Sequence, residues 1–152
     1  MYLFQGASAL SPFRIQRLYD EIKHDLPQLT SLGAEVVFIA WFNGPATPAE
    51  LRCLENLTGA TWRDVLEIDR TKASAFVTSR IGTISPWSSK ATEIGANCGL
   101  KSLVRLERIT HWSFGNVEKF DDRVAAAIHD PMTQTILCEI DDARSLEDQA
   151  LA

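Results

Sequence analysis

The first part of the chain carries the pattern of an amphipathic helix. Ser11 and Pro12 are residue types favoured at the N-cap and at the first position of a helix. The apolar side chains that follow recur at helical spacing: Ile15, Leu18, Tyr19, Ile22 and Leu26. Pro27 cannot continue this pattern, so we expect the helix to end before it.

Residues 35–42 form a dense run of β-branched and aromatic side chains between Gly33 and the turn residues Asn43, Gly44 and Pro45. Such a run, without strict alternation of polar and apolar positions, is typical of a strand that is covered on both faces. The sequence therefore predicts a central strand here, followed by a turn.

A second helix is predicted after this turn. Thr47 and Glu50 have the spacing of a capping box, and Pro48 stands at the first helical position. The buried edge of this helix is expected to carry Leu51, Leu54 and Leu57. Residues 58–72 have the weakest pattern in the chain, and we expect their larger apolar side chains to pack back on the core: Trp62, Val65, Leu66 and Ile68.

The second half of the chain has a similar order of elements. Residues 74–79 alternate as a strand, Gly82 opens a loop, and Ser85 and Pro86 begin a helix for which Gly99 is the expected C-cap. Residues 103–114 are the next predicted strand. A further amphipathic helix is marked by Val117, Phe120, Val124, Ala127 and Ile128, and it closes at Asp130 and Pro131.

A last strand is predicted from about Met132 to Ile140, and residues 141–152 form an acidic tail without a strong pattern. Two helix starts resemble each other: Gly6 leading to Leu10, Ser11, Pro12 and Phe13, and Gly82 leading to Ile84, Ser85, Pro86 and Trp87. This short repeat indicates two βαβα halves, the second followed by one more strand. We therefore expect an α+β fold whose helices pack on a shared, largely antiparallel sheet.

Composition agrees with one ordinary globular domain. The chain has 152 residues, of which 45% are hydrophobic and 23% charged, so a core of normal size is available. Its net charge of −5 has the wrong sign for a protein that binds nucleic acid mainly through phosphate contacts. Cys53, Cys98 and Cys138 are odd in number and far apart, which favours free thiols in a reducing compartment. With no signal peptide and no apolar run of membrane-spanning length, we expect a cytoplasmic protein.

The loop and helix over residues 80–99 are rich in groups that bind anions or cap backbone. They contain Arg80, Lys90 and the hydroxyl groups of Thr83, Ser85, Ser88 and Ser89, next to a predicted helix N-terminus. The segment is not a P-loop, because the glycine spacing and the Gly-Lys-Ser/Thr ending of that motif are missing. Capping and docking against another surface is the favoured interpretation, with a phosphate ligand as the alternative. Trp87 lies within this polar segment, where an aromatic side chain suits an interface anchor as well as a core position.

No catalytic set is assembled by the sequence alone. Cys98 lies at the predicted C-terminus of a helix, where the dipole disfavours a thiolate. His24, His111 and His129 lie on three different elements, so a Cys-His pair is open only as a minor alternative, and His129 fits a favourable interaction with a helix C-terminus. The spacings of common metal motifs are absent, so the sequence does not indicate a metal site.

A longer run changes the interpretation. RIGTISPWSSKATEIGANCGL, followed by Val104, Arg105, Leu106, Glu107 and Arg108, resembles the N-terminal region of the large, single-chain phosphoribosylformylglycinamidine synthase (formylglycinamide ribonucleotide amidotransferase). The opening of the chain is similar to that family at Gly6, Ala9, Leu10, Ser11, Phe13 and Arg14, and its end is similar at His129, Asp130 and Met132. The resemblance runs from Met1 to about Asp142. It is weak over residues 58–72, and Gln5 and Ser79 depart from the family's usual Arg and Pro.

The resemblance implies a place in purine biosynthesis. The family is a carbon-nitrogen ligase that uses glutamine and ATP to convert formylglycinamide ribonucleotide to formylglycinamidine ribonucleotide. Its N-terminal domain is similar to a fused pair of a small accessory subunit, and ATP, magnesium and the catalytic residues belong to the synthetase and glutaminase parts of the full-length enzyme. The isolated chain is then expected to be inactive and to help couple those two parts for ammonia transfer.

The resemblance also gives the chain an organisation and partners. We expect an accessory-subunit-like domain over residues 1–141 and the start of a linker or tail over residues 142–152. Its partners would be the synthetase, linker and glutaminase domains of the same polypeptide, with no nucleic acid and no membrane. The predicted docking face consists of Arg80, Thr83, Ser85, Trp87, Ser88, Lys90 and Asn97. Two alternatives stay open: a free-standing accessory subunit that binds separate synthetase and glutaminase chains, and a small independent enzyme that uses Cys98 or the hydroxyl-rich loop.

Overall fold

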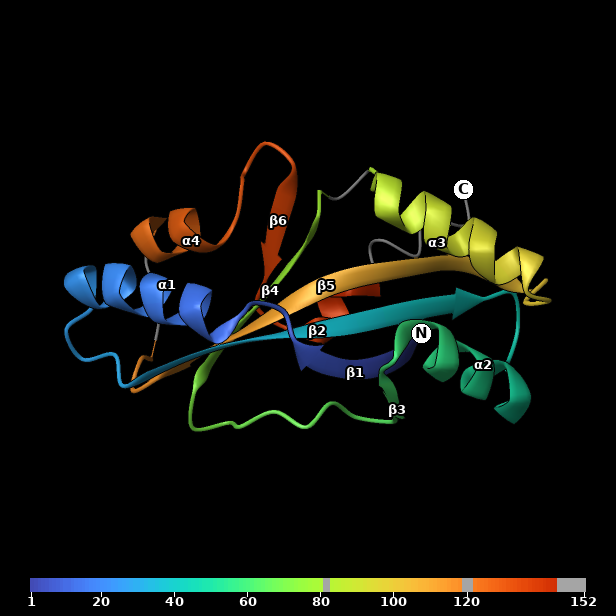
Figure 1. The fold of residues 1–152 in the computed structure, drawn as a ribbon, viewed down its shortest axis with the longest axis horizontal. Helices are drawn as coiled ribbons and strands as arrows, with labels where there is room; N and C mark the ends of the chain where they lie inside the picture. The colour runs from blue at the N-terminus through green and yellow to red at the C-terminus, as the bar shows by residue number, and fades with distance from the viewer. Residues whose placement is uncertain (81–82, 119–121, 145–152) are drawn as a thin grey trace.

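Six strands form one sheet with helices on one of its faces in the computed structural model, which describes residues 1–80, 83–118 and 122–144 (Figure 1). The strand order is β3-β1-β2-β5-β4-β6, and each pairing is antiparallel. The strands are β1 Tyr2–Ser8, β2 Ser31–Phe42, β3 Thr61–Arg63, β4 Ala73–Ser79, β5 Leu103–Gly115 and β6 Gln134–Leu137. The helices are α1 Pro12–Asp25, α2 Pro48–Thr58, α3 Pro86–Asn97 and α4 Asp122–Ile128, and a short 3₁₀ helix, η1, follows at Ile140–Ala143.

The predicted α+β fold with two βαβα halves is confirmed. The halves are β1-α1-β2-α2 and β4-α3-β5-α4, and β2 and β5 pair in the middle of the sheet. Val36 pairs with Thr110, and the same number of positions separates these partners as separates Ser11 from Ser85. The central pair therefore lies on the approximate two-fold axis that relates the halves.

The helix starts form as their sequences predict. The Ser11 hydroxyl accepts a hydrogen bond from the Arg14 N–H at 3.3 Å, and the Ser85 hydroxyl accepts one from the Ser88 N–H at 3.0 Å. Both bonds of the capping box at Thr47 and Glu50 are present. These local bonds satisfy donors that every helix N-terminus leaves free, which is why short sequence motifs predict them.

The C-terminus of α3 is a Schellman motif. Cys98 is the C-cap, and Gly99 follows it with a φ of 101°, a conformation that glycine adopts without strain. The Leu100 N–H bonds the Gly95 carbonyl at 3.0 Å, and the Gly99 N–H bonds the Ala96 carbonyl at 3.1 Å. Gly99 was predicted to be the C-cap, but Cys98 is the C-cap and Gly99 is the residue that follows it.

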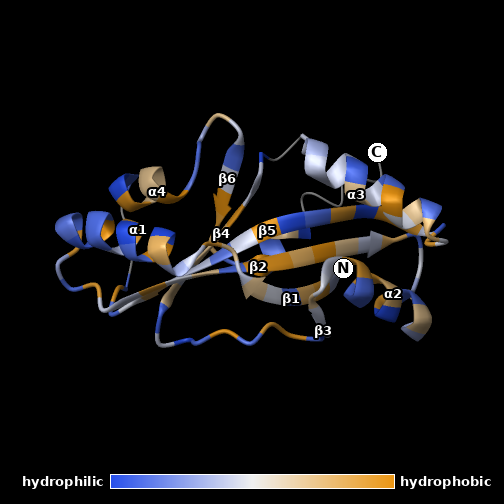
Figure 2. Ribbon diagram, in the orientation of Figure 1, coloured by the Kyte–Doolittle hydropathy of each residue, from blue (hydrophilic) through white to orange (hydrophobic). Residues whose placement is uncertain are grey.

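Both faces of the sheet are buried, but by different parts of the chain. Alternate β2 residues such as Ala34 and Ala40 face the four helices, where α1 and α4 cover one end and α2 and α3 the other (Figure 1). The intervening residues, such as Val37 and Ile39, belong to a cluster that Leu66 and η1 cover from the opposite side. Figure 2 shows hydrophobic colour along β2 and hydrophilic colour over most of α1.

Several expectations about exposure are wrong. Leu57 is 44% exposed, and Trp62 and Val65 are also exposed, whereas Leu66 and Ile68 pack on the core as expected. Trp62 belongs to β3, a three-residue edge strand, so only part of its surface is covered. Local apolar pattern does not show which of these side chains faces the sheet.

The last strand is also shorter than predicted, and β2 is longer. Met132 and Thr133 belong to a turn in which the Asp130 side chain accepts from the Met132 N–H at 2.9 Å, so β6 begins only at Gln134. At its other end, β6 stops at Leu137 and Ile140 begins η1, which buries Ala143. β2 begins at Ser31, not at residue 35, because its first residues pair with the long strand β5.

The helix predicted from Val117 onward starts later. α4 spans Asp122–Ile128, with Val124 and Ile128 buried and Ala127 exposed, while Val117 is buried ahead of the helix. The predicted roles of Phe120 and of Gly82 lie outside the described residues. In the part of the chain that the structure describes, no helix is long and apolar enough to cross a membrane.

Helix α3 completes the hydrogen bonding of β5 where β4 no longer does. The β4–β5 ladder ends at Val77 and Thr110, so β5 residues before that point have no strand on this side. The buried Ser88 hydroxyl donates to the Leu106 carbonyl at 2.6 Å, and the Leu106 N–H donates to the Thr92 hydroxyl oxygen at 3.0 Å. Two side chains of α3 thus take the place of a strand.

We expect Ser88→Ala to lower the free energy of unfolding by about 1 to 2 kcal/mol, because it leaves the buried Leu106 carbonyl without its donor. Urea unfolding of the 152-residue chain measures this loss. Ser89→Ala is the matched control, since Ser89 is exposed on the same helix. Equal effects of the two substitutions would contradict the role given to Ser88.

His111 is a buried titratable side chain in β5. Its ring stacks on Phe76 with centroids 4.6 Å apart, and its Nε2 atom lies 3.0 Å from the Ser74 hydroxyl oxygen. Burial lowers the pKa of His111 below its usual value of 6.5, and the nearby Glu35 carboxylate only partly opposes this shift.

Because the unfolded chain binds a proton at higher pH than buried His111 does, we expect the free energy of unfolding to fall as the pH drops below about 6.5. Urea titrations across this range should show a weaker pH dependence for His111→Gln than for the unchanged chain. His24→Gln, at an exposed position in α1, should keep the original dependence. An unchanged pH profile in His111→Gln would rule out this source of the effect.

Candidate functional site

A buried ion pair lies on β5 beside the start of α3. Arg105 and Glu107 are two residues apart on the strand, so their side chains point to the same face, and Nη2 lies 2.7 Å from Oε2. Both side chains are 2% exposed. The Arg105 guanidinium also lies 6.0 Å from the centroid of the Trp41 ring. Two charges in this environment are stable only with close partners.

This ion pair fixes the segment that leads into α3. Arg105 Nη2 donates to the Thr83 carbonyl oxygen at 3.2 Å, and the Ser85 hydroxyl donates to Glu107 Oε1 at 3.2 Å. The Ser79 hydroxyl, at the end of β4, approaches the same carboxylate at 3.4 Å. Ser85 therefore caps α3 with its oxygen and binds Glu107 with its proton, which sets where the helix begins.

A hollow of about 670 Å³ lies beside this segment, between the end of β4, the start of α3 and the turn before β6. Four of the seven predicted docking residues line it: Arg80, Thr83, Ser85 and Trp87. Thr78 and Arg108 also line it. The Thr78 hydroxyl group is buried and has no hydrogen-bond partner among the described residues. It can therefore donate a hydrogen bond to a group that enters the hollow, or accept one from it. We call this the α3 hollow.

The other three predicted residues do not line this hollow, although Lys90 shares a neighbouring groove with Trp87. Ser88 is fully buried, and its hydroxyl is committed to Leu106, so the expectation that it faces a partner is wrong. Lys90 is exposed and lines a neighbouring groove. Asn97 is exposed but is the last residue of α3, at the other end of the helix.

Arg105 and Glu107 were not expected to support the site. The signal for them is present in the sequence, because two opposite charges stand at alternate positions within a strand of apolar residues. Alternate positions share one face, and a salt bridge is the arrangement that makes two such charges compatible with burial.

The cysteines and histidines are separate from the hollow. Cys53 is partly buried in α2, and Cys98 and Cys138 are exposed free thiols. His129 follows the last residue of α4, where its Nδ1 atom contacts the Ala125 carbonyl oxygen, as expected for a histidine at a helix C-terminus. Over the described residues, no group of three or more His, Cys, Asp or Glu side chains is placed to hold a metal ion.

A family model described as formylglycinamide ribonucleotide amidotransferase N-terminal matches residues 35–146 of this chain. The chain belongs to this family. The match begins within β2 and includes α3, β5 and every residue named in the α3 hollow. The resemblance carried by residues 80–100 is thereby confirmed.

Arg105→Met should lower the free energy of unfolding by about 3 to 5 kcal/mol, because it leaves the Glu107 carboxylate buried without its cation. Adding Glu107→Gln to the same chain should recover part of this loss, since the uncompensated charge is then removed. Arg108→Met, at the neighbouring exposed position, is the control and should change little. Urea unfolding tests all three, and an equal loss in the single and double variants would contradict the charge argument.

Proposed function

We propose that this chain is a non-catalytic assembly domain of formylglycinamide ribonucleotide amidotransferase, the glutamine-dependent ligase of purine biosynthesis. In this proposal the α3 hollow docks on the synthetase part and helps hold it beside the glutaminase part. Ammonia released from glutamine then passes to the synthetase without loss to water. The observation that carries the proposal is the α3 hollow itself, in which four residues of the family-like segment meet on a support fixed by Arg105 and Glu107.

The chemistry of the α3 hollow suits a protein partner. Trp87 is 37% exposed and packs against Phe38 with ring centroids 5.8 Å apart, so it offers a large aromatic surface that is already held in place. Arg80 and Thr83 supply exposed polar groups around it. A tryptophan with arginine and hydroxyl groups at its rim is a composition typical of binding hot spots.

The proposal assigns the cofactors to other parts of the enzyme. As the family resemblance implies, we place ATP and magnesium in the synthetase part. We also place the synthetase and glutaminase parts in the same polypeptide, with a linker that begins near residue 142, and the enzyme in the cytoplasm. A separate accessory subunit would use the same docking surface on a different chain.

Arg80→Ala combined with Trp87→Ala in the full-length enzyme should uncouple glutamine hydrolysis from product formation. Truncation of a central tryptophan costs on the order of 2 kcal/mol of docking free energy, and ammonia then escapes to water. The measurement is the ratio of glutamate formed to formylglycinamidine ribonucleotide formed, which should rise.

Phe13→Ala is the matched control for this experiment. Phe13 stands after Ser11 and Pro12 as Trp87 stands after Ser85 and Pro86, and it is also exposed. Its substitution should leave the ratio unchanged. A ratio that stays the same in the Arg80 and Trp87 double variant would overturn the proposed function.

A further inference from the structure

A second hollow lies on the helix-covered face, between α2 and α3. Phe38 of β2 and Leu106 and Arg108 of β5 line its floor. Its walls consist of Leu57 and Thr58 from α2 and of Trp87, Lys90, Ala91 and Ile94 from α3. We call it the α2–α3 groove. Leu57 and Ile94 are 44% and 46% exposed, so large apolar side chains line a surface that water reaches.

The duplicated half shows that the fold does not need these apolar side chains. When the sequences of the two halves are aligned so that Ser11 matches Ser85, Asp20 matches Ile94 and Arg17 matches Ala91. Asp20 and Arg17 are exposed on α1, where charged side chains are the ordinary choice for a solvated helix surface. At these two positions the side chain is charged on α1 and apolar on α3.

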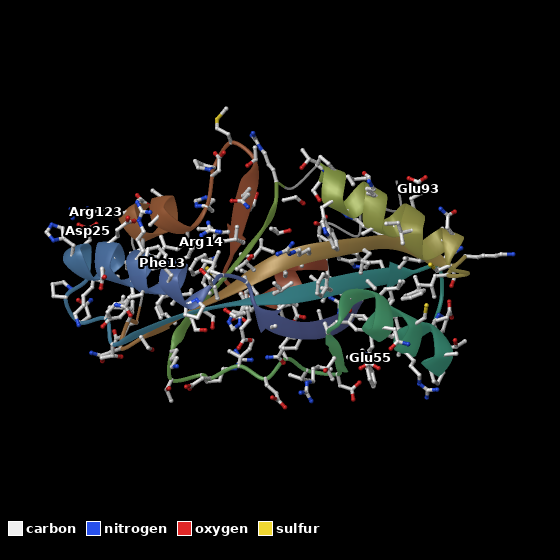
Figure 3. The ribbon with its side chains drawn as sticks, in the orientation of Figure 1. Phe13, Arg14, Asp25, Glu55, Glu93 and Arg123 are labelled. Atoms are coloured by element: carbon white, nitrogen blue, oxygen red, sulfur yellow. The ribbon has the colours of Figure 1, made fainter. Side chains whose placement is uncertain are left out.

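The two helix pairs also differ in how they pack. α1 lies beside α4, and Asp25 and Arg123 point toward one another across them with Oδ1 and Nη1 3.6 Å apart (Figure 3). Between α2 and α3 lies the groove, whose floor is the central pair of strands. Leu57 and Ile94 thus expose apolar surface inside a hollow, and this combination is typical of a surface that binds a partner.

The charge of the groove restricts what covers it. Its described lining contains Lys90 and Arg108 and no Asp or Glu, although the chain as a whole has a net charge of −5. Glu55 and Glu93, labelled on α2 and α3 in Figure 3, are not among the lining residues. A segment that carries carboxylates beside an apolar side chain would match both features of this surface.

We propose that the α2–α3 groove binds an acidic segment of the synthetase part, whose apolar side chain lies between Leu57 and Ile94 and whose carboxylates pair with Lys90 and Arg108. This inference rests on the proposed function and names the chemistry of a second contact. Trp87 and Arg108 line both the groove and the α3 hollow, so the two contacts are continuous on one surface.

The test places a photo-crosslinking amino acid in the full-length enzyme at position 94, and in a parallel variant at position 57. Both side chains are exposed, so the substitutions spare the core. Mass spectrometry should identify one peptide of the synthetase part that contains Asp or Glu next to a large apolar residue. Crosslinks to the glutaminase part, to a second copy of this domain, or to nothing at both positions would overturn the inference.

A third variant with the crosslinker at position 83, which is exposed and lines the α3 hollow but not the groove, separates this inference from the proposed function. Crosslinking to the synthetase part from position 83 but from neither position 94 nor position 57 would reject the groove contact and leave α3-hollow docking standing. Absence of synthetase crosslinks from all three positions would reject both.

The contribution of the Lys90 charge is tested in the variant that carries the crosslinking amino acid at position 57. Lys90→Glu should lower the yield of the crosslink by about tenfold, because the new carboxylate faces those of the partner. Lys90→Arg keeps the positive charge and should retain the yield. Equal yields for the two substitutions would overturn the proposed pairing with carboxylates.

Discussion

The buried pair of Arg105 and Glu107 is the interaction on which the candidate docking surface depends. It joins β5 to the end of β4, to the loop backbone at Thr83 and to the cap of α3 at Ser85. Removing two charges from water carries a desolvation cost, and hydrogen bonds to neighbouring groups offset it only in one geometry. The pair therefore specifies the positions of the Thr83 backbone and of the helix start at Ser85 more than it adds to stability.

The place where β4 separates from β5 explains both hollows. The two strands pair as far as Val77 and Thr110. Beyond them, the Ser88 and Thr92 hydroxyl groups of α3 form the hydrogen bonds to the β5 backbone. A helix beside a strand cannot follow it as closely as another strand does, because the helix is about twice as wide as the spacing between paired strands. Space is left at the start of α3 and along its side, and the α3 hollow and the α2–α3 groove occupy these two places.

Features that depend on neighbours in the sequence were predictable, and features that depend on distant neighbours were not. The caps at Ser11 and Ser85 involve groups three residues apart, so a short motif is sufficient. The burial of Ser88 depends on the Leu106 carbonyl eighteen positions away, and nothing local distinguishes it from exposed Ser89. For the same reason the sequence identified the segment that lines the α3 hollow, but not which of its hydroxyl groups faces outward, nor that Glu107 supports it. The docking role of this segment stays a prediction.

The approximate two-fold axis near Val36 and Thr110 has a consequence for stoichiometry. Two identical chains related by such an axis would present every patch twice, and each patch would accept its own partner molecule. In this chain the two halves differ, so the surface with Trp87 and Ile94 occurs once, while the corresponding positions on the other half carry Phe13 and Asp20. In the proposed docking, a surface that occurs once on a nearly symmetric scaffold seats one partner in one orientation.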